Sequence, residues 1–563
     1  MFFLFFLLFN CVSIYFFRKW LGPVGLYCFS SLFIIITICG IAFVFFKQLS
    51  FGNYYFFDAG RIFYIYDFFD MNFIFISDSL STTTSLLVLT LTLFAQFFGV
   101  EYMYREAFIM RLLYLLIFFA TSVVFLFYVY DFFLVLVVWE LIGLFSLLLV
   151  NFYSVRIYTI KAAFKTFIFS RLSDFFIFIA FFLIVVSVGS TDFSILFIQI
   201  PFFMFYNVYI FNLGFNFLNI LTLCLVFAGA IKAAQFPFHV WLPDAMEAPT
   251  PASALIHSST LVIMGIYLII RFSIIFEFSY FSNLVLMLMG GLTITIGAVS
   301  ASFQNDIKKL VAYSTVSQMG YLFCGCGFLA YTEVLFYLTV HALNKAFLFI
   351  MVGYIVHFFN GNTDMRFMGN LYPYAPDIVF ILIVISLNLS GLPLTSGFLS
   401  KEFLIFQTFK DDYASLVTRV FWFFSFVLTP FYMFFLNWFV LFKLKQNFVK
   451  LYVYNKPLTA VNFKPLTSLF KLPLIFSSLF SKPTTLVLFS LLSLILFTGE
   501  FCLFILFNSL NLLEVNLSSV LLESNLTPFL ANSLFSCSLV STLNIVILTS
   551  CAASARYLWN LVN

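Results

Sequence analysis

Charged side chains are scarce in this 563-residue chain. Asp, Glu, Lys and Arg make up 9% of it, with 27 Lys and Arg against 23 Asp and Glu, whereas soluble domains carry about 25% charged residues. Hydrophobic residues make up 63%, and the mean hydropathy is +1.11. So few charges cannot coat a water-facing surface of this size, which excludes soluble enzymes, nucleic-acid-binding proteins and disordered scaffolds. The composition indicates a polytopic membrane protein.

Sequence motifs for cofactors and metals are also missing. The nine cysteines form no Cys-x-x-Cys pair, so we expect neither a zinc or iron–sulfur site nor a disulfide framework. No Walker loop occurs. A glycine-rich match at 325–330 lies inside an apolar run with no preceding strand, and it does not indicate a dinucleotide site. We therefore expect no NADH, flavin or ATP site on this chain.

Long apolar runs are what the chain has instead. A hydrocarbon core about 30 Å thick needs roughly 20 apolar residues per helix, and these runs lack the period-2 alternation of barrel strands. The sequence therefore predicts an all-α polytopic membrane protein of about 15 transmembrane helices, or about 16 if residues 466–481 also cross. The predicted spans are 2–17, 24–46, 78–98, 109–129, 132–152, 160–188, 217–240, 252–271, 283–304, 309–330, 333–359, 377–409, 417–443, 484–508 and 536–559.

Lysine and arginine gather on one side of the predicted topology. By the positive-inside rule this side faces the matrix or cytoplasm, and the amino terminus faces away from it. The stretch 443–482 has seven Lys and no Asp or Glu, and it belongs on the same side. The side of the carboxyl terminus depends on whether 466–481 crosses, and both topologies fit the sequence. The residues that set the orientation are Arg18, Lys19, Arg105, Arg111, Arg156, Lys161, Lys308, Lys309 and Arg366.

Phenylalanine is unusually frequent, with 90 residues. Leu, Val and Ala would be equally apolar, so no physical requirement selects Phe. Its codons are rich in T, and an AT-rich genome would favour it. Our hypothesis is that the chain is encoded in an organelle, and a GC-rich nuclear gene would contradict it.

Ionisable side chains inside the predicted spans are the main functional candidates. Each costs roughly 2.5–3.5 kcal/mol to insert and is a functional candidate by default. His341 and Lys345 are spaced i,i+4 and share one helical face, and Arg171 and Asp174 are spaced i,i+3 and can pair. The candidates are Glu140, Arg171, Asp174, Lys232, His257, His341, Lys345 and Lys401.

Each candidate also has a structural interpretation. A lone membrane lysine can snorkel to the interface or be buried neutral. Arg171 and Asp174 can form a structural clamp, and His257 alone fits a hydrogen-bonded core residue. His239 and His357 lie near span ends and are interpreted as interfacial. Because several spans carry buried charges and two of them also carry helix breakers, the set favours function over these alternatives.

Two spans are interrupted by helix breakers. Pro237 follows Lys232 in one of them, and Gly391 and Pro393 precede Lys401 in the other. Interrupted helices at matching positions indicate inverted repeats with ion sites near the membrane midplane. We predict two inverted five-helix repeats, each with a broken helix. The predicted organisation is 1–108 for the N-terminal helices, 109–271 and 283–443 for the two repeats, and 444–563 for a basic loop and C-terminal helices.

Two motifs resemble a known family. Residues 241–260 (WLPDAMEAPTPASALIHSST) and 306–321 (DIKKLVAYSTVSQMGY) are similar to the signature of the antiporter-like chain 5 subunits of respiratory complex I. The similarity covers roughly residues 70–410, and Mrp-type sodium/proton antiporter subunits share the same core. It implies proton translocation coupled to NADH:ubiquinone oxidoreduction, with Glu140 and Lys232 as the paired charges of one half-channel and Arg171 and Asp174 beside them. His257, His341, Lys345 and Lys401 are implied as the central polar axis and exit.

The resemblance also carries expectations about surroundings. It implies that NADH, FMN, iron–sulfur clusters and ubiquinone bind to other subunits of the complex. The implied partners are membrane-arm subunits, especially the antiporter-like subunit 4, and lipids such as cardiolipin, with no nucleic acid. The implied location is the mitochondrial inner membrane.

The carboxyl end departs from the family pattern. The family has a long lateral amphipathic helix, whereas residues 509–527 would form a helix only about 30 Å long. This helix is either shortened here or partly replaced by another subunit. Two other functions fit the same core: a stand-alone cation/proton antiporter, and a structural end-piece whose channel has degenerated. The choice between proton and sodium is not determined by these residues.

Overall fold

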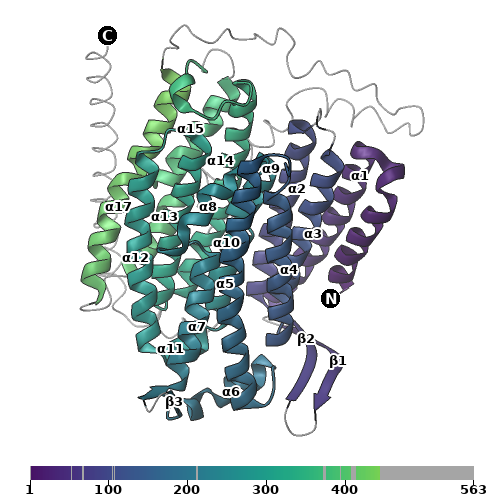
Figure 1. Cartoon of the computed structure of the whole chain (residues 1–563), viewed down its shortest axis with the longest axis vertical. Coiled ribbons are helices and arrows are strands. Elements are labelled where there is room, and N and C mark those ends of the chain that lie inside the picture. Colours follow the sequence, from purple (N-terminus) through teal and green to yellow (C-terminus); the bar gives the residue numbers. More distant parts are fainter. Residues whose placement is uncertain are drawn as a thin grey trace.

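The computed structural model describes residues 2–443 apart from 52–53, 66–68, 104–105, 107, 211–212, 372–375, 393–394 and 408–413, and helices dominate this part (Figure 1). The long helices are α1 (Phe2–Phe51), α2 (Ser79–Tyr102), α3 (Ile109–Tyr128), α4 (Phe132–Val150), α5 (Ile157–Val188), α7 (Phe217–Lys232), α12 (Tyr280–Ser302), α13 (Ile307–Gly327), α14 (Tyr331–Phe358), α15 (Pro376–Ser390), α16 (Ser396–Gln407) and α17 (Ala414–Asn437). The shorter helices are α6 (Phe193–Phe203), α8 (Trp241–Asp244), α9 (Thr250–Ser258), α10 (Leu261–Arg271) and α11 (Ser273–Glu277). The strands are β1 (Tyr55–Ile65), β2 (Phe69–Ser77), β3 (Asn207–Ile210) and β4 (Leu213–Asn216).

The helices confirm the predicted membrane fold. Within the described residues, nine helices are long and apolar enough to span a bilayer, and shorter apolar helices account for other predicted spans. The predicted pair 2–17 and 24–46 forms α1, which bends at Gly22, where φ is 64° and Pro23 follows. The predicted segments 466–481, 484–508, 509–527 and 536–559 lie outside the described residues. The inverted relation of the two repeats stays a prediction.

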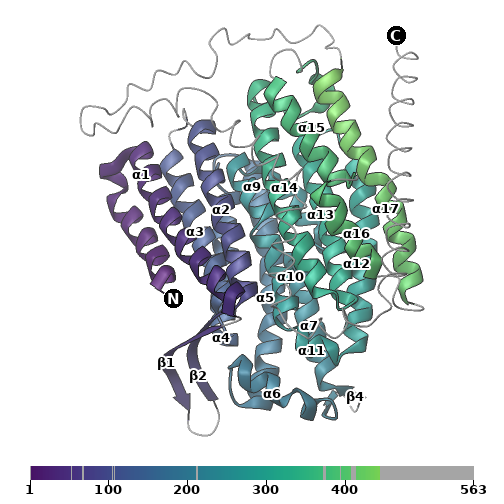
Figure 2. The same cartoon turned by 180° about the vertical axis from the view of Figure 1, so that it is seen from behind.

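Two β-hairpins lie between the helices of the predicted all-α fold. The strands β1 and β2 pair antiparallel between α1 and α2, and β3 and β4 pair between α6 and α7. Both hairpins lie at the same end of the helical bundle (Figures 1 and 2). The backbone of the first hairpin is anchored to the α3–α4 turn, where Tyr130 N donates to Ile74 O at 2.9 Å. These strands are short additions between spans, so hydropathy did not reveal them.

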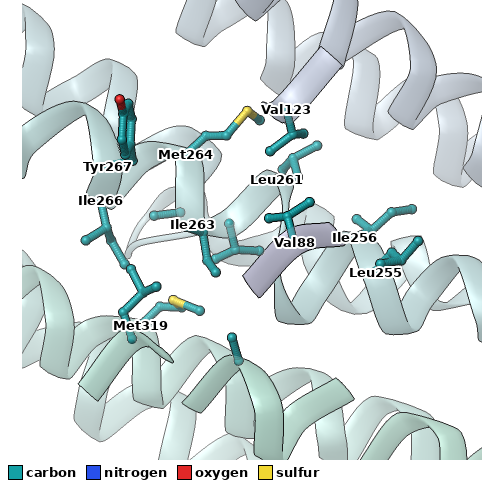
Figure 3. Packing of buried hydrophobic residues seen from close by; sticks show 14 of the residues in the cluster. Val88, Val123, Leu255, Ile256, Leu261, Ile263, Met264, Ile266, Tyr267 and Met319 are labelled. Atoms are coloured by element: carbon teal, nitrogen blue, oxygen red, sulfur yellow. The ribbon is translucent and has the colours of Figure 1, made fainter. Parts of the chain in front are cut away.

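The helix pair α9 and α10 occupies the centre of the bundle. Every residue of its most apolar segment is buried, and Figure 3 shows Leu261 and Ile263 packed near Val88 of α2, with Met319 of α13 nearby. Dispersion contacts between closely packed apolar side chains are the main favourable contribution to such packing in a membrane. The motif at 241–260 therefore leads directly into the most enclosed helix of the fold.

A buried ion pair closes the hairpin end of this centre. Arg271, the last residue of α10, pairs with Asp78 at 2.5 Å between Nη1 and Oδ2. Its Nη2 also donates to the Tyr267 hydroxyl at 2.7 Å and to the Phe127 carbonyl at 3.0 Å. Arg271 thereby joins α2, α3 and α10, and its buried guanidinium has the partners that such burial requires.

Helices α12 and α13 approach unusually closely. A Cβ added at Gly297 would lie 2.7 Å from the Ser317 backbone nitrogen, and one added at Gly290 would lie 2.7 Å from the Cys324 nitrogen. Small residues let helix backbones approach in membranes, where packing rather than hydrophobic exclusion drives association. At Gly291 an added Cβ meets only the Phe421 ring, at 2.7 Å. A side chain can move aside, but a helix backbone cannot do so without shifting the whole helix.

We expect Gly297→Ala to lower the thermal unfolding midpoint of the purified protein in mild detergent. The added methyl forces α12 and α13 apart, and overpacking of this kind costs about 1–3 kcal/mol. Gly291→Ala, on the same helix, is the matched control and should cost less because Phe421 can rotate away. Equal midpoints for the two variants would contradict the close-packing argument.

Asp131 caps α4 at the hairpin end. Its Oδ1 accepts from Phe133 N at 2.8 Å and Leu134 N at 3.2 Å, and its Oδ2 accepts from the Thr191 hydroxyl at 2.5 Å. Burial raises the pKa of this carboxyl to about 6. The Asp192 carboxylate also acts to raise the pKa, whereas these hydrogen bonds act to lower it. A carboxyl whose pKa is raised in the folded state stabilises the fold when the pH is below its pKa in the unfolded state. This stabilisation is lost as the pH rises through about 6.

We expect Asp131→Asn to stabilise the protein increasingly between pH 4.5 and pH 7.5. The amide still caps the helix, but it carries no charge that burial would penalise at neutral pH. The measurement is the unfolding midpoint of both proteins across this range. A difference that stays constant with pH would show that Asp131 does not titrate in this range.

Candidate functional site

Glu140, Arg171 and Asp174 form one charged cluster between α4 and α5. Arg171 Nη1 lies 3.5 Å from Glu140 Oε1 and 3.3 Å from Asp174 Oδ2. The Glu140 and Arg171 side chains are 34% and 36% exposed, whereas that of Asp174 is 5% exposed. The sequence predicted the Arg171–Asp174 pair, but the ion pair between Glu140 and Arg171 depends on packing between two helices.

Lys232 ends α7 and is buried. The helix closes there because Ala233 N and Gln235 N return to the carbonyls of Gly229 and Ala230, both at 2.8 Å. The ammonium lies 5.3 Å from the centre of the Trp139 ring. Within the described part of the chain, its Nζ has no hydrogen-bond partner. Two features support its charge: the partial negative charge of a helix C-terminus and the face of an indole ring.

Polar groups line a small cavity beside this lysine. The cavity touches Ser146 of α4, Thr166 and Ser170 of α5, Lys232 and Trp241. At Gly143, a Cβ would lie 3.4 Å from Lys232 Nζ. Hydroxyls in such a site can hydrogen-bond water. The lysine therefore has three hydroxyl side chains of α4 and α5 near it, in a cavity whose other lining residues are mostly apolar.

His257 lies at a helix break that the sequence did not predict. The predicted single span 252–271 is divided into α9 and α10 at Ser259 and Thr260. The imidazole is fully buried between Trp241 and Phe349, with ring centroids 6.4 and 6.0 Å away. Among the described atoms, neither ring nitrogen has a partner.

The second group of lysines lies among hydroxyls. Lys345 Nζ donates to the Ser314 hydroxyl at 2.6 Å, and Lys401 Nζ donates to the Thr429 hydroxyl at 3.2 Å. Both lysines are buried, as is His341 on the same face as Lys345. Of the ion pairs within the described ranges, none joins Lys232, Lys345 or Lys401 to a carboxylate within 4.0 Å.

The predicted break before Lys401 is present. Helix α15 ends at Ser390, Gly391 has φ of 73°, and α16 begins at Ser396. The Asn388 side chain holds the two pieces together, because its Oδ1 accepts from Gly397 N at 2.6 Å. Its Nδ2 donates to Asn344 Oδ1 on α14 at 2.9 Å. Freed backbone groups in membrane helices require such partners.

A family model matches residues 129–429, which is more than half of the chain, and its description is NADH:quinone oxidoreductase/Mrp antiporter, TM. The chain belongs to this family. Every predicted site residue, from Glu140 to Lys401, lies within the matched region. The assignment of individual roles to these residues stays a prediction.

Curated relatives carry the name NADH-ubiquinone oxidoreductase chain 5. The protein of Nyctotherus ovalis is 44% identical over 361 residues, which cover 63% of this chain and 20% of that protein. The protein of Paramecium tetraurelia is 41% identical over 339 residues, covering 59% and 58%, and that of Chondrus crispus is 37% identical over 345 residues, covering 61% and 51%. The matched part of the chain thus spans between a fifth and three fifths of these relatives.

A solved structure has the same architecture. The structure of the Mrp complex from Dietzia sp. DQ12-45-1b contains a chain that is 25% identical, with a TM-score of 0.65. The match covers 78% of this chain and 47% of that chain. Membership of the family, expected from the two motifs, and the membrane fold, expected from the long apolar runs, are confirmed.

Several buried polar residues were missed by sequence reasoning. Gln235 accepts a hydrogen bond from Thr293 of α12 at 2.7 Å and so joins the two predicted repeats. Gln318, Tyr321, Tyr337 and Tyr432 are buried near the lysines of the second repeat. Polar uncharged residues inside predicted spans were the available signal, but attention to ionisable groups passed over them.

Proposed function

We propose that the chain is a proton-translocating membrane subunit of respiratory complex I, in which NADH:ubiquinone oxidoreduction drives proton pumping. The observation that carries this proposal is the set of three buried lysines, Lys232, Lys345 and Lys401, in the core of the family. Burial disfavours a charged lysine, and nearby carboxylates favour it. A lysine between these influences can take up and release a proton when its surroundings change.

The charged cluster on α4 and α5 changes the electrostatic surroundings of Lys232. In the structure Glu140 is held by Arg171 at 3.5 Å, and none of the described carboxylates lies within 4.0 Å of Lys232. When Glu140 turns toward Lys232, the lysine holds its proton. When Arg171 draws Glu140 away, the desolvated ammonium of Lys232 releases its proton. Asp174 stays beside Arg171 and balances part of its charge.

The released proton travels along the central axis. His257 lies beside the broken α9–α10 pair, and His341 and Lys345 share a face of α14. Water completes the path between these groups, since a chain of hydroxyls, imidazoles and water can pass protons. Lys401, beside the break between α15 and α16, is the exit. Quinone reduction elsewhere in the complex supplies the energy.

The surroundings of the chain are part of the proposal. NADH, FMN, iron–sulfur clusters and ubiquinone bind to other subunits, and this chain carries none of them. Neighbouring membrane-arm subunits, especially the antiporter-like subunit 4, and lipids such as cardiolipin are the partners. The one-third exposure of Glu140 and Arg171 supports a protein neighbour, because a charge facing lipid is costly. The mitochondrial inner membrane is the proposed location, with encoding in the organelle.

A cation/proton antiporter is the second candidate. It is favoured by the similarity to a chain of the Mrp complex, with a TM-score of 0.65. Both candidates use the same core. A native gel of mild-detergent membranes separates them, because co-migration with a large NADH-oxidising band supports the complex I subunit. Migration apart from that band, with sodium-dependent proton flux in vesicles, supports the antiporter.

We expect Glu140→Gln and Lys401→Ala each to lower NADH-driven proton pumping at least about tenfold, since each removes a charge that the transfer uses. Quinone reduction coupled to pumping should fall with it, while assembly on the native gel survives. The measurement is dye-reported proton uptake by reconstituted liposomes. Asp364→Asn is the control, because Asp364 forms an ion pair with Arg366, whose side chain is 61% exposed. Full coupled activity in both test variants would rule out the assignment.

Arg171 provides a separate test of the mechanism. We expect Arg171→Gln to slow pumping about tenfold, because Glu140 loses the partner that draws it from Lys232. Arg171→Lys retains the positive charge and should retain most of the rate. If the two variants behaved alike, the charge of Arg171 would not be what controls Glu140.

A further inference from the structure

A second cavity touches α4 and α10, nearer the hairpin end than the cavity beside Lys232. We call the cavity beside Lys232 the inner cavity and the second one the outer cavity. The outer cavity is lined by Trp139 of α4 and by Tyr267 and Arg271 of α10, among other residues. Because Arg271 belongs to the buried ion pair that closes the hairpin end, the outer cavity lies directly behind that pair.

The two cavities follow one another in the same order along both helices. On α4, Trp139 lines the outer cavity and Ser146 lines the inner one. On α10, Tyr267 lines the outer cavity and Leu261 the inner one, and the two side chains lie apart along the helix (Figure 3). The separation along each helix axis is about 9–10 Å. Both helices therefore place the outer cavity between the inner cavity and the hairpin end.

Trp139 lies at the boundary between the two cavities. Its side chain is fully buried and lines the outer cavity. The Lys232 ammonium, which lines the inner cavity, lies over the same ring at 5.3 Å from its centre. The indole nitrogen donates to the Ser173 hydroxyl of α5 at 3.3 Å, and this bond fixes the orientation of the ring. The indole is therefore the group through which the lysine and the outer cavity meet.

A partly exposed ion pair lies beyond each cavity. Thr166 lines the inner cavity, and Lys165 next to it pairs with Asp244, with side chains that are 34% and 43% exposed. Arg271 lines the outer cavity, and the side chain of its partner Asp78 is 25% exposed. Solvent thus reaches charged groups beyond both cavities, and only the groups between the cavities keep these two sides apart.

The lining of the outer cavity is unfavourable for water. Apart from Trp139, Tyr267 and Arg271, its lining residues are all leucine, valine or phenylalanine. Apolar cavities stay dry, and hydrophobic constrictions block the passage of ions because water leaves them. A dry cavity behind a large ring therefore leaves the Lys232 ammonium without a water path to the hairpin end.

We propose that Trp139 is a seal that separates Lys232 from the hairpin end of the membrane. This inference rests on the proposed function, in which the proton leaves Lys232 along the central axis. Without the seal, protons accumulated at the hairpin end would reach Lys232 and return through the inner cavity, and the gradient would be lost without useful work. Trp139 acts by exclusion of water, and it exchanges no proton itself.

Trp139→Ala is the decisive variant. We expect liposomes that contain the intact complex with this variant to lose an imposed pH gradient at least about tenfold faster in the absence of NADH, because water can enter the space left by the ring. Trp139→Phe keeps an aromatic ring and should lose the gradient within about threefold of the unchanged rate. A pH-sensitive dye inside the liposomes measures both rates.

Phe98→Ala is the matched control. It removes a fully buried ring that packs against Tyr354 of α14 and lines neither cavity. A packing defect alone therefore predicts equal effects of Trp139→Ala and Phe98→Ala, whereas the seal predicts a leak only from the former. A native gel verifies assembly. If Trp139→Ala does not assemble, Trp139→Leu carries the same test and should leak at a rate between those of the Phe variant and about tenfold above the unchanged complex.

Two further measurements identify the path of the leak. Adding Lys232→Met to Trp139→Ala should remove the leak, because the proton then has no lysine to pass through. In coupled liposomes Trp139→Ala should lower net proton uptake while quinone reduction continues. Glu140→Gln differs, since we expect it to lower both.

Three outcomes would overturn the seal: a gradient that Trp139→Ala holds as well as the unchanged complex, an equal leak from Phe98→Ala, or a leak that persists after Lys232→Met. The leak is measured without NADH, so it does not depend on pumping. If Glu140→Gln and Lys401→Ala abolish pumping while Trp139→Ala holds the gradient, the seal fails and the proposed function stands. If Glu140→Gln and Lys401→Ala pump normally, the proposed function itself fails.

Discussion

The burial of lysine ammonium groups inside a membrane bundle is the constraint on which the rest of the structure depends. Lys232 lies at the C-terminus of α7, against an indole ring and beside a glycine that leaves room for its amine. These contacts compensate only part of the lost hydration. In the proposed mechanism, a small movement of a nearby carboxylate would decide the protonation state of this lysine. A fully paired lysine would be more stable but could not exchange its proton readily.

The helix breaks follow from the same constraint. A straight apolar helix would leave no polar backbone groups near the lysines, whereas α7, the α9–α10 pair and the α15–α16 pair all end or restart inside the bundle. Asn388 satisfies backbone and side-chain groups at one break, and the Gln235–Thr293 bond follows another. Polar side chains therefore stabilise the breaks and, at the same time, link the two predicted repeats.

Hydropathy and motif spacing were sufficient to predict the spans within residues 2–443, the family and two of the three breaks described there, because each has a local signal in the sequence. The hairpins were missed since short strands between long apolar runs do not stand out. The α9–α10 break was missed because Ser259 and Thr260 are not helix breakers, and tertiary packing sets their conformation. The family resemblance implied Glu140 and Lys232 as paired charges, and in the structure Glu140 makes its ion pair with Arg171. Which charges meet across helices depends on how the side chains pack, and one sequence does not encode that in any local pattern.

The two repeats solve the problem of buried charge differently. Around Lys232 the surroundings contain formal charges, so moving Glu140 or Arg171 changes the electrostatic field directly. Around Lys345 and Lys401, the direct partners that the structure describes are hydroxyls, which can pass protons without carrying a net charge. In the proposed mechanism, a field change at the first predicted repeat would reach lysines whose described hydrogen-bond partners are uncharged. In the proposed mechanism, this division would let one end of the path respond to charge movement while the other conducts.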